Sequence, residues 1–332
     1  MKSVVLPAYN KNVLRAMLSL EVKDISLPKL EKNEVLIKTY ASACNPSDIA
    51  FIQGVYNIVK PLPATPGFEA SGEVVETGED SKQYLGKKVS AFVQGENHGT
   101  WAEYFVAKNT DIIPMIDEMD MDQAACFTVN PFTAYAMFQT VDITDAKAII
   151  QNASGSQVAN FIRKMAQEFG ADIIDIVRKK ETADILIAEG AKYVLVETDE
   201  LFDEQLKELT DKLKPTVGFD AVGGSLTGKI FNAIAPHSDL IVYGGLSNKN
   251  ISELSVMDTI FNDKVLSGFN LVDWKNQLED GEFDKISEHL QLKFIDNTYK
   301  TKIHKSVELD NIVLGLKSYL GNMSAGKLLI KP

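Results

Sequence analysis

The sequence predicts an α/β protein of two domains: a compact β domain, and a second domain built on a six-stranded, doubly wound parallel sheet. Its length of 332 residues suits about two domains. The first third carries short strand-like segments separated by turns rich in Gly and Pro, which is typical of a β domain. From about Ala124 onward, strand-like and helical segments alternate, and this alternation calls for a parallel sheet covered by helices.

Composition and charge narrow the classes of function. Hydrophobic residues make up 45% and charged residues 24% of the chain, which is ordinary for a soluble globular protein. The net charge of −12 argues against general affinity for nucleic acid or an anionic membrane. We expect neither a membrane span nor a signal peptide. Cys44 and Cys126 cannot form a disulfide framework, and they fit a reducing cytoplasm.

The strands of the β domain are predicted from β-branched and aromatic runs bounded by turns. Turn clusters at 61–63 and 78–80 separate these runs. The tail of the chain ends in a short strand that we expect to return to this domain. The predicted strands are 35–40, 72–77, 88–93, 100–106 and Lys327–Lys331.

In the second domain, the clearest helix follows the first strand. Its apolar residues recur every three to four positions, on one helical face, and Gly170 closes it: Val158, Phe161, Ile162, Met165, Ala166 and Phe169. Further helices are predicted over 181–189, 204–213 and 226–235. The six predicted strands are 148–150, 173–177, 193–196, 217–222, 240–243 and 265–269. Six strands in this alternation match the dinucleotide-binding arrangement.

The turn after the first strand is built from small residues that suit a pyrophosphate. It runs Ala153, Ser154, Gly155, Ser156, Gln157 and Val158. A helix N-terminus offers N–H groups and the positive end of a dipole to such an anion. The match to G-x-G-x-x-G is poor, because only Gly155 is glycine. An ordinary tight turn capped by Ser154 or Ser156 is the alternative, but the surrounding strands and helices favour the cofactor.

The end of the second strand favours NADPH over NADH. An NAD-specific site usually carries an acid about 20 residues after the glycine turn, for the ribose. Here Arg178, Lys179 and Lys180 follow the strand, and an arginine grips a 2′-phosphate with charge-assisted hydrogen bonds. Asp175 is near the right spacing but falls within the apolar strand. The alternative for the basic residues is a solvated helix start.

Six segments, in order along the chain, resemble the medium-chain dehydrogenase/reductase superfamily. They are NPSDI at 45–49, IQGVY at 52–56, PGFEASGEV at 66–74, GTWAEYFV at 99–106, VNPFTAY at 129–135 and FDAVGG at 219–224. The zinc-independent quinone oxidoreductases and 2-enoyl thioester reductases are the most similar branch. The resemblance implies a GroES-like catalytic domain over 1–124 and 273–332, and a Rossmann NADP-binding domain over 125–272. It also implies a homodimer that shares the sheet edge near 265–269.

The zinc ligands of this superfamily have no counterpart here. Zinc-dependent members use two cysteines and a histidine, at positions that read Asn45, Phe68 and Val129 in this chain. An amide, a phenyl ring and an isopropyl group cannot form that tetrahedral site. The four-cysteine structural lobe is also missing, because residues 94–99 pass directly where it would sit. We therefore expect no zinc and no other metal site.

Without zinc, the Lewis acid that polarises an alcohol is missing. The expected acceptor is a small, electron-poor molecule, either a quinone or the β-carbon of an enone or enoyl thioester. Tyr56 is the candidate proton donor, because a phenol stays protonated at pH 7 and the resemblance places a catalytic Tyr in such a segment. A packed loop aromatic is the alternative. Asn45 is expected to bind the nicotinamide or the substrate carbonyl, or else to cap the turn before Pro46.

The remaining expected contacts to the cofactor come from one helix and several strand ends. Thr133 resembles the helix residue that lines the nicotinamide pocket; its alternative is a hydroxyl bonded to its own helix. Ligands of open α/β sheets lie beyond the carboxyl ends of the strands. The residues predicted there, which could otherwise simply be strand ends, are Ala221, Val222, Tyr243, Gly244, Phe269, Asn270 and Leu271. Lys327, from the final strand, completes the set.

Three functions are compatible with these features. The leading one is NADPH-dependent reduction of quinones or other activated conjugated carbonyls, without zinc. The second is reduction of 2-enoyl thioesters with Tyr56 as proton donor. The third is a non-catalytic NADPH-binding protein.

Overall fold

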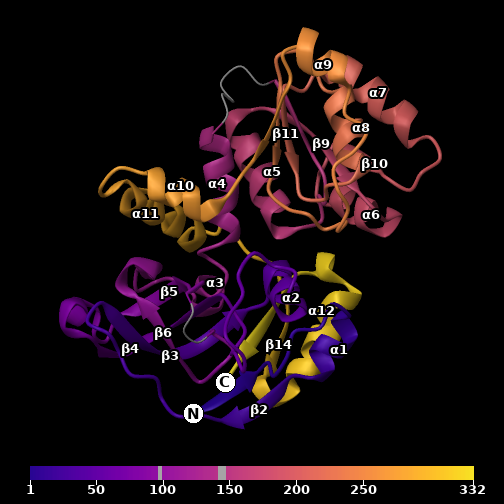
Figure 1. The fold of residues 1–332 in the computed structure, drawn as a ribbon. Helices are drawn as coiled ribbons and strands as arrows, with labels where there is room; N and C mark the ends of the chain where they lie inside the picture. The colour runs from indigo at the N-terminus through magenta and orange to yellow at the C-terminus, as the bar shows by residue number, and fades with distance from the viewer. Residues whose placement is uncertain (96–98, 141–146) are drawn as a thin grey trace. The chain divides into compact units, whose positions relative to one another are not determined.

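The structure is a computed structural model that describes residues 1–95, 99–140 and 147–332, so residues 96–98 of the segment compared with the zinc lobe lie outside it. The described residues form two compact units, one of Met1–Asn130 with Asp280–Pro332 and one of Pro131–Glu279. The domain boundaries predicted from the sequence, at 124/125 and 272/273, stay a prediction, because compact units do not show which parts fold independently. In Figure 1 the yellow C-terminal segment lies within the same unit as the indigo N-terminus.

The first unit is built on one large sheet and one small antiparallel pair. The pair is β1 (Lys2–Val5) with β2 (Glu21–Asp24). The large sheet runs in the order β14 (Ile303–Glu308), β15 (Lys327–Lys331), β3 (Glu34–Ala43), β4 (Glu69–Thr77), β5 (Lys88–Phe92) and β7 (Ile112–Pro114), with β6 (Tyr104–Lys108) also paired to β3. Because β15 pairs with β3, the predicted return of the tail to the β domain is confirmed.

Helices of the first unit cover this sheet. They are α1 (Val13–Leu18), α2 (Pro46–Gln53), α3 (Met121–Ala124), α11 (Glu282–Ile295) and α12 (Ile312–Gly321), with 3₁₀ turns η1 (Glu79–Tyr84), η2 (Asn109–Asp111), η3 (Leu309–Asn311) and η4 (Met323–Ala325). Phe51 of α2, Leu316 of α12 and Trp101 share one buried apolar cluster. Burial of that apolar surface fixes α2 in place, and α2 follows Asn45 directly.

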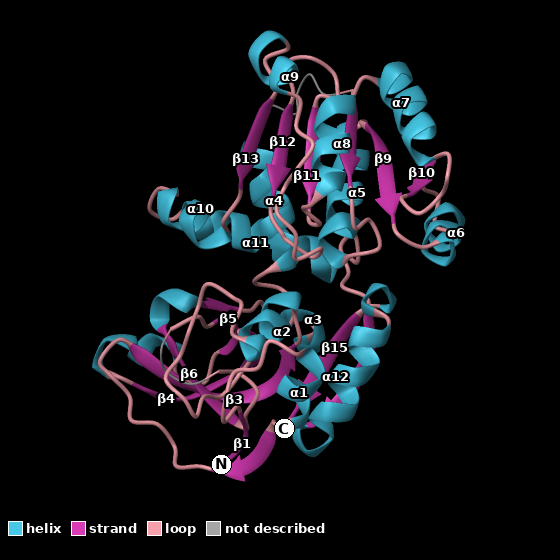
Figure 2. Cartoon of the chain, turned by 45° about the vertical axis from the view of Figure 1, so that its right-hand side comes forward, coloured by secondary structure: helices cyan, strands magenta, loops and turns pink. Residues whose placement is uncertain are grey.

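The second unit contains the predicted parallel sheet. Its strand order is β10 (Tyr193–Val196), β9 (Asp172–Val177), β8 (Ala148–Gln151), β11 (Val217–Asp220), β12 (Asp239–Val242) and β13 (Val265–Gly268), with every neighbouring pair parallel. Numbered along the chain this is the order 3-2-1-4-5-6, the dinucleotide-binding arrangement. Figure 2 shows these strands side by side with helices around them. The helices are α4 (Asn130–Thr140), α5 (Gln157–Phe169), α6 (Lys180–Ala188), α7 (Phe202–Leu213), α8 (Ser225–Ala233), α9 (Val256–Phe261) and α10 (Leu271–Gln277).

One predicted strand begins later than expected. The pattern predicts a strand over 100–106, but β6 begins at Tyr104. The backbone N–H groups of Thr100 and Trp101 instead donate to the carbonyl oxygens of Gly67 and Pro66, each at 3.0 Å. These turn contacts take the donors that a sheet ladder would need.

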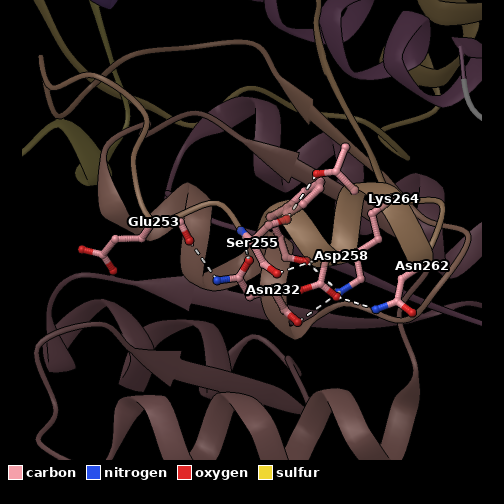
Figure 3. A network of polar contacts seen from close by, with 8 residues as sticks. Asn232, Glu253, Ser255, Asp258, Asn262 and Lys264 are labelled. Carbon is pink, nitrogen blue, oxygen red and sulfur yellow. Dashed lines mark hydrogen bonds and ion pairs between the residues drawn. The ribbon is translucent and has the colours of Figure 1, made fainter.

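A buried lysine ties α8, α9 and the start of β13 together (Figure 3). Lys264 is 3% exposed, and its Nζ donates to the carbonyl oxygens of Phe231 and Asn232, both at 3.0 Å. It also forms an ion pair with Asp258 Oδ1 at 3.0 Å. The Asn232 side chain in turn accepts from Ser255 N at 2.9 Å. This network fixes the edge of the sheet next to β13.

No helix in the described part of the chain is both long and apolar enough to cross a membrane.

Candidate functional site

The predicted cofactor residues of the second unit gather at one edge of its sheet. The turn of residues 153–158 follows β8, and Arg178 with Lys179 follows β9. Ala221 and Val222 follow β11, Tyr243 and Gly244 follow β12, and Phe269 to Leu271 follow β13. Because the strands are parallel, all these segments lie beyond their carboxyl ends, where open α/β sheets bind ligands.

The turn before α5 is compatible with both interpretations considered above, a capped turn and a phosphate-binding turn. Ser156 is the N-cap of α5, and its Oγ accepts from Ala159 N at 3.2 Å. Ser154 is fully buried, and its N–H donates to the carbonyl oxygen of Ile176 at 3.1 Å. The turn therefore is capped, as the alternative expects, and it also presents the first turn of a helix of 13 residues to the same edge.

Tyr243 lies next to Ser156 of this turn. Its hydroxyl is buried. Burial raises the pKa of Tyr243, and the hydrogen bond with the Ser156 side chain offsets part of that shift. A phenol hydroxyl at a helix N-terminus can donate to an anionic ligand.

The basic residues after β9 are exposed, whereas the acid within β9 is not. Arg178 is exposed immediately after the strand ends at Val177. Lys179 is the N-cap residue of α6 and is exposed as well. Asp175 is fully buried and forms an ion pair with Arg163 of α5 at 2.8 Å. One oxygen of its carboxylate is therefore paired inside the unit, and the other, Oδ2, is buried as well.

The segment after β11 is shaped by a polar network that the sequence did not reveal. Asp220 accepts from Asn152 Nδ2 at 2.5 Å, from Val222 N at 2.7 Å and from the hydroxyl of Thr227. Asn152 Oδ1 also accepts from Ala221 N at 2.8 Å. The signal available was the motif FDAVGG itself, in which an acid at a buried strand end precedes two glycines. Those glycines, at 223 and 224, have φ values of 73° and 74°, in the left-handed region that favours glycine.

The remaining predicted contacts of this unit lie on helices or at their starts. Asn270 is the N-cap of α10, and its Oδ1 accepts from Val272 N at 2.9 Å. Phe269 N donates to Val242 O at 2.9 Å, which extends the strand pairing by one residue. Thr133 lies on α4 and is 8% exposed.

In the first unit, Asn45 and Lys327 belong to one buried network. The Asn45 Nδ2 donates to Glu69 Oε2 at 2.9 Å, and Lys327 Nζ donates to Asn45 Oδ1. Glu69 Oε1 accepts from Val129 N at 2.9 Å. Burial raises the pKa of Glu69, and the charge of Lys327 opposes that shift. Asn45 therefore holds the Lys327 ammonium group inside this unit, where each of the two residues is 3% exposed.

Two buried charges next to this network were missed by the sequence analysis. Asp48 is fully buried, and its Oδ2 accepts from Asn45 N at 2.7 Å. Burial raises the pKa of Asp48 to about 7. Lys60 is 3% exposed, its Nζ lacks a partner within the same ranges, and it lies 5.6 Å from the Phe68 ring. Burial lowers the pKa of Lys60 to about 8, against the charge of Asp48.

Tyr56 follows α2 in the loop that borders this cluster. Its ring centroid lies 5.5 Å from that of Phe68, and its hydroxyl accepts from Gln94 Nε2 at 3.4 Å. Burial raises the pKa of Tyr56, and the charge of Asp48 raises it further. The phenol is therefore protonated at neutral pH, as a proton donor must be, although it is also packed as a loop aromatic would be.

No group of three or more His, Cys, Asp or Glu residues in the described part of the chain is arranged to hold a metal ion. Asn45 and Phe68, at two of the positions compared with zinc ligands, are committed to the polar network and the aromatic cluster described above. The residues present do not fit a zinc ion.

Comparisons with known proteins agree with this architecture. Residues 31–117 match the family described as "Alcohol dehydrogenase GroES-like domain", and 158–288 match "Zinc-binding dehydrogenase". The mitochondrial enoyl-[acyl-carrier-protein] reductase of Rattus norvegicus is 31% identical over 274 residues, covering 80% of this chain and 72% of that protein. The Arabidopsis thaliana protein of the same name is 33% identical over 266 residues, covering 75% and 68%.

Solved structures show the same likeness. A candidate NADPH:quinone reductase of Mesorhizobium loti has a TM-score of 0.94 and 32% identity, covering 100% of this chain and 98% of that one. A 2-enoyl thioester reductase heterodimer of Candida tropicalis shares the fold, with a TM-score of 0.81 and 22% identity over 100% and 99% of the two chains. The chain therefore belongs to the medium-chain dehydrogenase/reductase superfamily, in the branch of the quinone oxidoreductases and enoyl thioester reductases, and is an oxidoreductase with a GroES-like and a Rossmann domain.

Proposed function

We propose that the chain is an NADPH-dependent, zinc-free reductase of quinones or other activated conjugated carbonyls. The observation that carries the cofactor assignment is the contrast at β9: Arg178 is exposed directly after the strand, whereas Asp175 is buried and paired with Arg163. An exposed guanidinium at this place suits the 2′-phosphate that distinguishes NADPH. When bound, NADPH supplies the hydride.

The second unit fits the rest of a dinucleotide. The N-terminus of α5 offers backbone N–H groups for the pyrophosphate, and the Tyr243 hydroxyl is buried beside Ser156, the residue that caps this helix. Ala221, Val222, Gly244 and the segment 269–271 are our candidates for the contacts to the remaining parts of the cofactor, with Thr133 for the nicotinamide. In the first unit, we assign Asn45 to orienting the carbonyl and Lys327 to holding Asn45.

The acceptor class rests on two observations. The Mesorhizobium loti relative, matched over 98% of its length, is described as a candidate NADPH:quinone reductase. The side chains at the superfamily's zinc-ligand positions, Asn45, Phe68 and Val129, do not suit a Lewis-acid metal, so that an acceptor already activated by conjugation suits the chain best. The alternative, reduction of a 2-enoyl thioester, is favoured by the relatives named enoyl-[acyl-carrier-protein] reductase and by a protonated phenol at Tyr56.

The deciding experiment combines a substrate panel with the substitution Tyr56→Phe. Steady-state rates with NADPH are measured for a simple ortho-quinone and for a 2-enoyl thioester, and cofactor binding is measured separately. Rapid turnover of the quinone that Tyr56→Phe hardly changes supports the first function, since a quinone oxygen can take its proton from water.

Turnover confined to the thioester supports the alternative. On that function Tyr56→Phe should slow catalysis by at least about tenfold with NADPH affinity unchanged, because a positioned acid contributes about 100- to 10,000-fold. Binding of NADPH without turnover of either substrate would make the chain a non-catalytic binding protein. No binding of NADPH would overturn the proposal.

We further propose that the protein acts as a homodimer in the cytoplasm. Strand β13 ends the sheet, and the neighbouring α9 exposes a row of apolar side chains: Val256, Met257, Ile260 and Phe261, which are 61–71% exposed. An unpaired edge beside such a patch suits a second copy of the chain. Two buried cysteines without a disulfide fit a reducing compartment.

A further inference from the structure

The phosphate-binding turn has an unusual backbone for its sequence. Ala153 has a φ of 47°, in the left-handed region that residues with a side chain disfavour. The dinucleotide fingerprint places glycines in this turn, but the chain has only Gly155 there. A strained turn with few glycines persists only when contacts with the surrounding structure hold its backbone in place.

Arg163 makes the contacts that hold this turn from α5. Its Nη1 donates to the carbonyl oxygen of Ser154 at 2.8 Å and to Asp175 Oδ1 at 2.8 Å. Gln151, the last residue of β8, donates to the same Asp175 oxygen at 2.7 Å. The Arg163 side chain is 12% exposed and that of Asp175 is fully buried, so solvent screens this ion pair little.

These bonds connect the three segments that form the turn. Ser154 lies within the turn, Asp175 lies in β9, and Arg163 lies two helical turns into α5. The Ser154 N–H also donates to Ile176 O of β9 at 3.1 Å. The turn is therefore fixed to β9 by its own backbone and by the Arg163–Asp175 pair.

We propose that Arg163 and Asp175 act as a positioning pair that holds the turn of residues 153–156 in the conformation that receives the pyrophosphate of a dinucleotide. This inference rests on the proposed cofactor binding. The pair does not touch the cofactor; it raises the fraction of molecules whose turn is ready to bind. Because NADPH and NADH share the pyrophosphate, the pair serves both equally, unlike Arg178.

The first test is Arg163→Met, which keeps the aliphatic packing and removes the guanidinium. If the turn is then ready in only about a tenth to a fifth of the molecules, the Kd rises by about five- to tenfold. The rise should be the same for NADPH and NADH in fluorescence titrations. A rise confined to NADPH would place Arg163 at the 2′-phosphate and overturn the proposal.

Arg163→Met also leaves the Asp175 carboxylate buried without its cation, which destabilises the whole unit. The double variant Arg163→Met/Asp175→Asn removes that charge, and the new amide oxygen can still accept from Gln151. We expect its urea midpoint to recover toward that of the wild type while both Kd values stay raised, because Ser154 O still lacks its donor. Recovery of both Kd values together with stability would reduce Arg163 to a merely structural residue and overturn the proposal.

A matched control is Arg15→Met, on an exposed position of α1 in the other unit. It should change neither Kd nor the urea midpoint. If the wild type binds neither NADPH nor NADH, the proposed function fails, and this inference fails with it. If the wild type binds and the double variant binds equally well, only the positioning pair is refuted.

Discussion

Lys60 places an ammonium group inside the first unit, over the rings of Phe51 and Phe68, at a cost in stability that depends on pH. Burial lowers its pKa from 10.5 to about 8. Below about pH 8 the side chain is charged in both the folded and the unfolded states, and the desolvation cost is fully present. As the pH rises from about 8 to 10.5, the folded state loses its proton first and the cost disappears.

Lys60→Met should therefore raise the free energy of unfolding at pH 7 by about 1–3 kcal/mol, since one pKa unit corresponds to about 1.4 kcal/mol. The gain should shrink toward zero as the pH approaches about 10.5. Urea denaturation at pH 7, 9 and 10.5 measures it, with the exposed Lys82→Met as control. A gain that is independent of pH would show that packing, not ionisation, is responsible.

Arg178 is the residue on which cofactor selectivity depends. A charge-assisted contact to the 2′-phosphate contributes about 1.5–3 kcal/mol, so Arg178→Ala should raise the Kd for NADPH by about 10- to 150-fold. The Kd for NADH should barely change. Lys192→Ala, which removes an ion pair with Asp172 at the opposite end of β9, is the control in the same titrations. Equal weakening of both cofactors by Arg178→Ala would disprove the assignment.

At the scale of single residues, the sequence predicted where a residue lies on a strand better than it predicted which side chain that residue contacts. The sequence placed Arg178 at a strand end and Asp175 within a strand, and the structure agrees. It did not predict that Asp175 meets Arg163, or that Lys60 lies near Asp48, because these contacts join segments that only the folded chain brings together. Hydrophobic periodicity shows which face is buried; it does not show which polar side chains meet there.

At the scale of elements, Lys264 joins α8, α9 and the start of β13 at the dimer edge we propose. Lys264→Met would leave the carbonyl oxygens of Phe231 and Asn232 without their donor and Asp258 without its cation. We expect the free energy of unfolding to fall by about 1.5–3 kcal/mol, the range for hydrogen bonds to charged groups. Urea denaturation measures the change.

The control is Lys207→Met, which breaks an exposed pair with Asp211 on α7. Exposed pairs of this kind contribute only about 0.3–0.5 kcal/mol. A loss for Lys264→Met no larger than that of the control would mean that water replaces the ammonium group.

The sequence predicted most elements of the second unit, because amphipathic helices and buried strands differ in period. Strands β10 and β15 have the predicted bounds, and α5 begins one residue before its predicted apolar face. The short helices were not predicted. In α9, four of six residues are exposed and apolar, so that no polar face marks the helix. The strand expected from Thr100 begins only at Tyr104 for a different reason: the backbone donors of Thr100 and Trp101 pair with a distant turn.

At the scale of the whole molecule, the proposed homodimer is open to a direct test. Sedimentation velocity at micromolar concentration should show a dimer. Phe261→Asp places a charge on the exposed apolar row of α9 and should yield a monomer with an unchanged fold by circular dichroism. Phe169→Asp, on an exposed apolar residue at the end of α5, is the control and should remain dimeric. A monomeric wild type would refute this interface.

The overall architecture could be predicted from the sequence because alternation of strands and helices leaves few topologies. The resemblance supplied the GroES-like domain, and the family comparison confirms it. The arrangement of Asp48, Lys60 and Glu69 could not be predicted. Asp, Glu and Lys side chains are usually exposed, so nothing in the sequence marks these three as buried.

The placement of the two thiols has a consequence for the acceptors we propose. Cys44 and Cys126 are fully buried, and burial raises the pKa of each. Quinones and enones are electrophiles that alkylate thiolates, and a reactive cysteine must be both ionised and accessible. With neither thiol ionised or accessible, the enzyme should process such electrophiles without being inactivated by them.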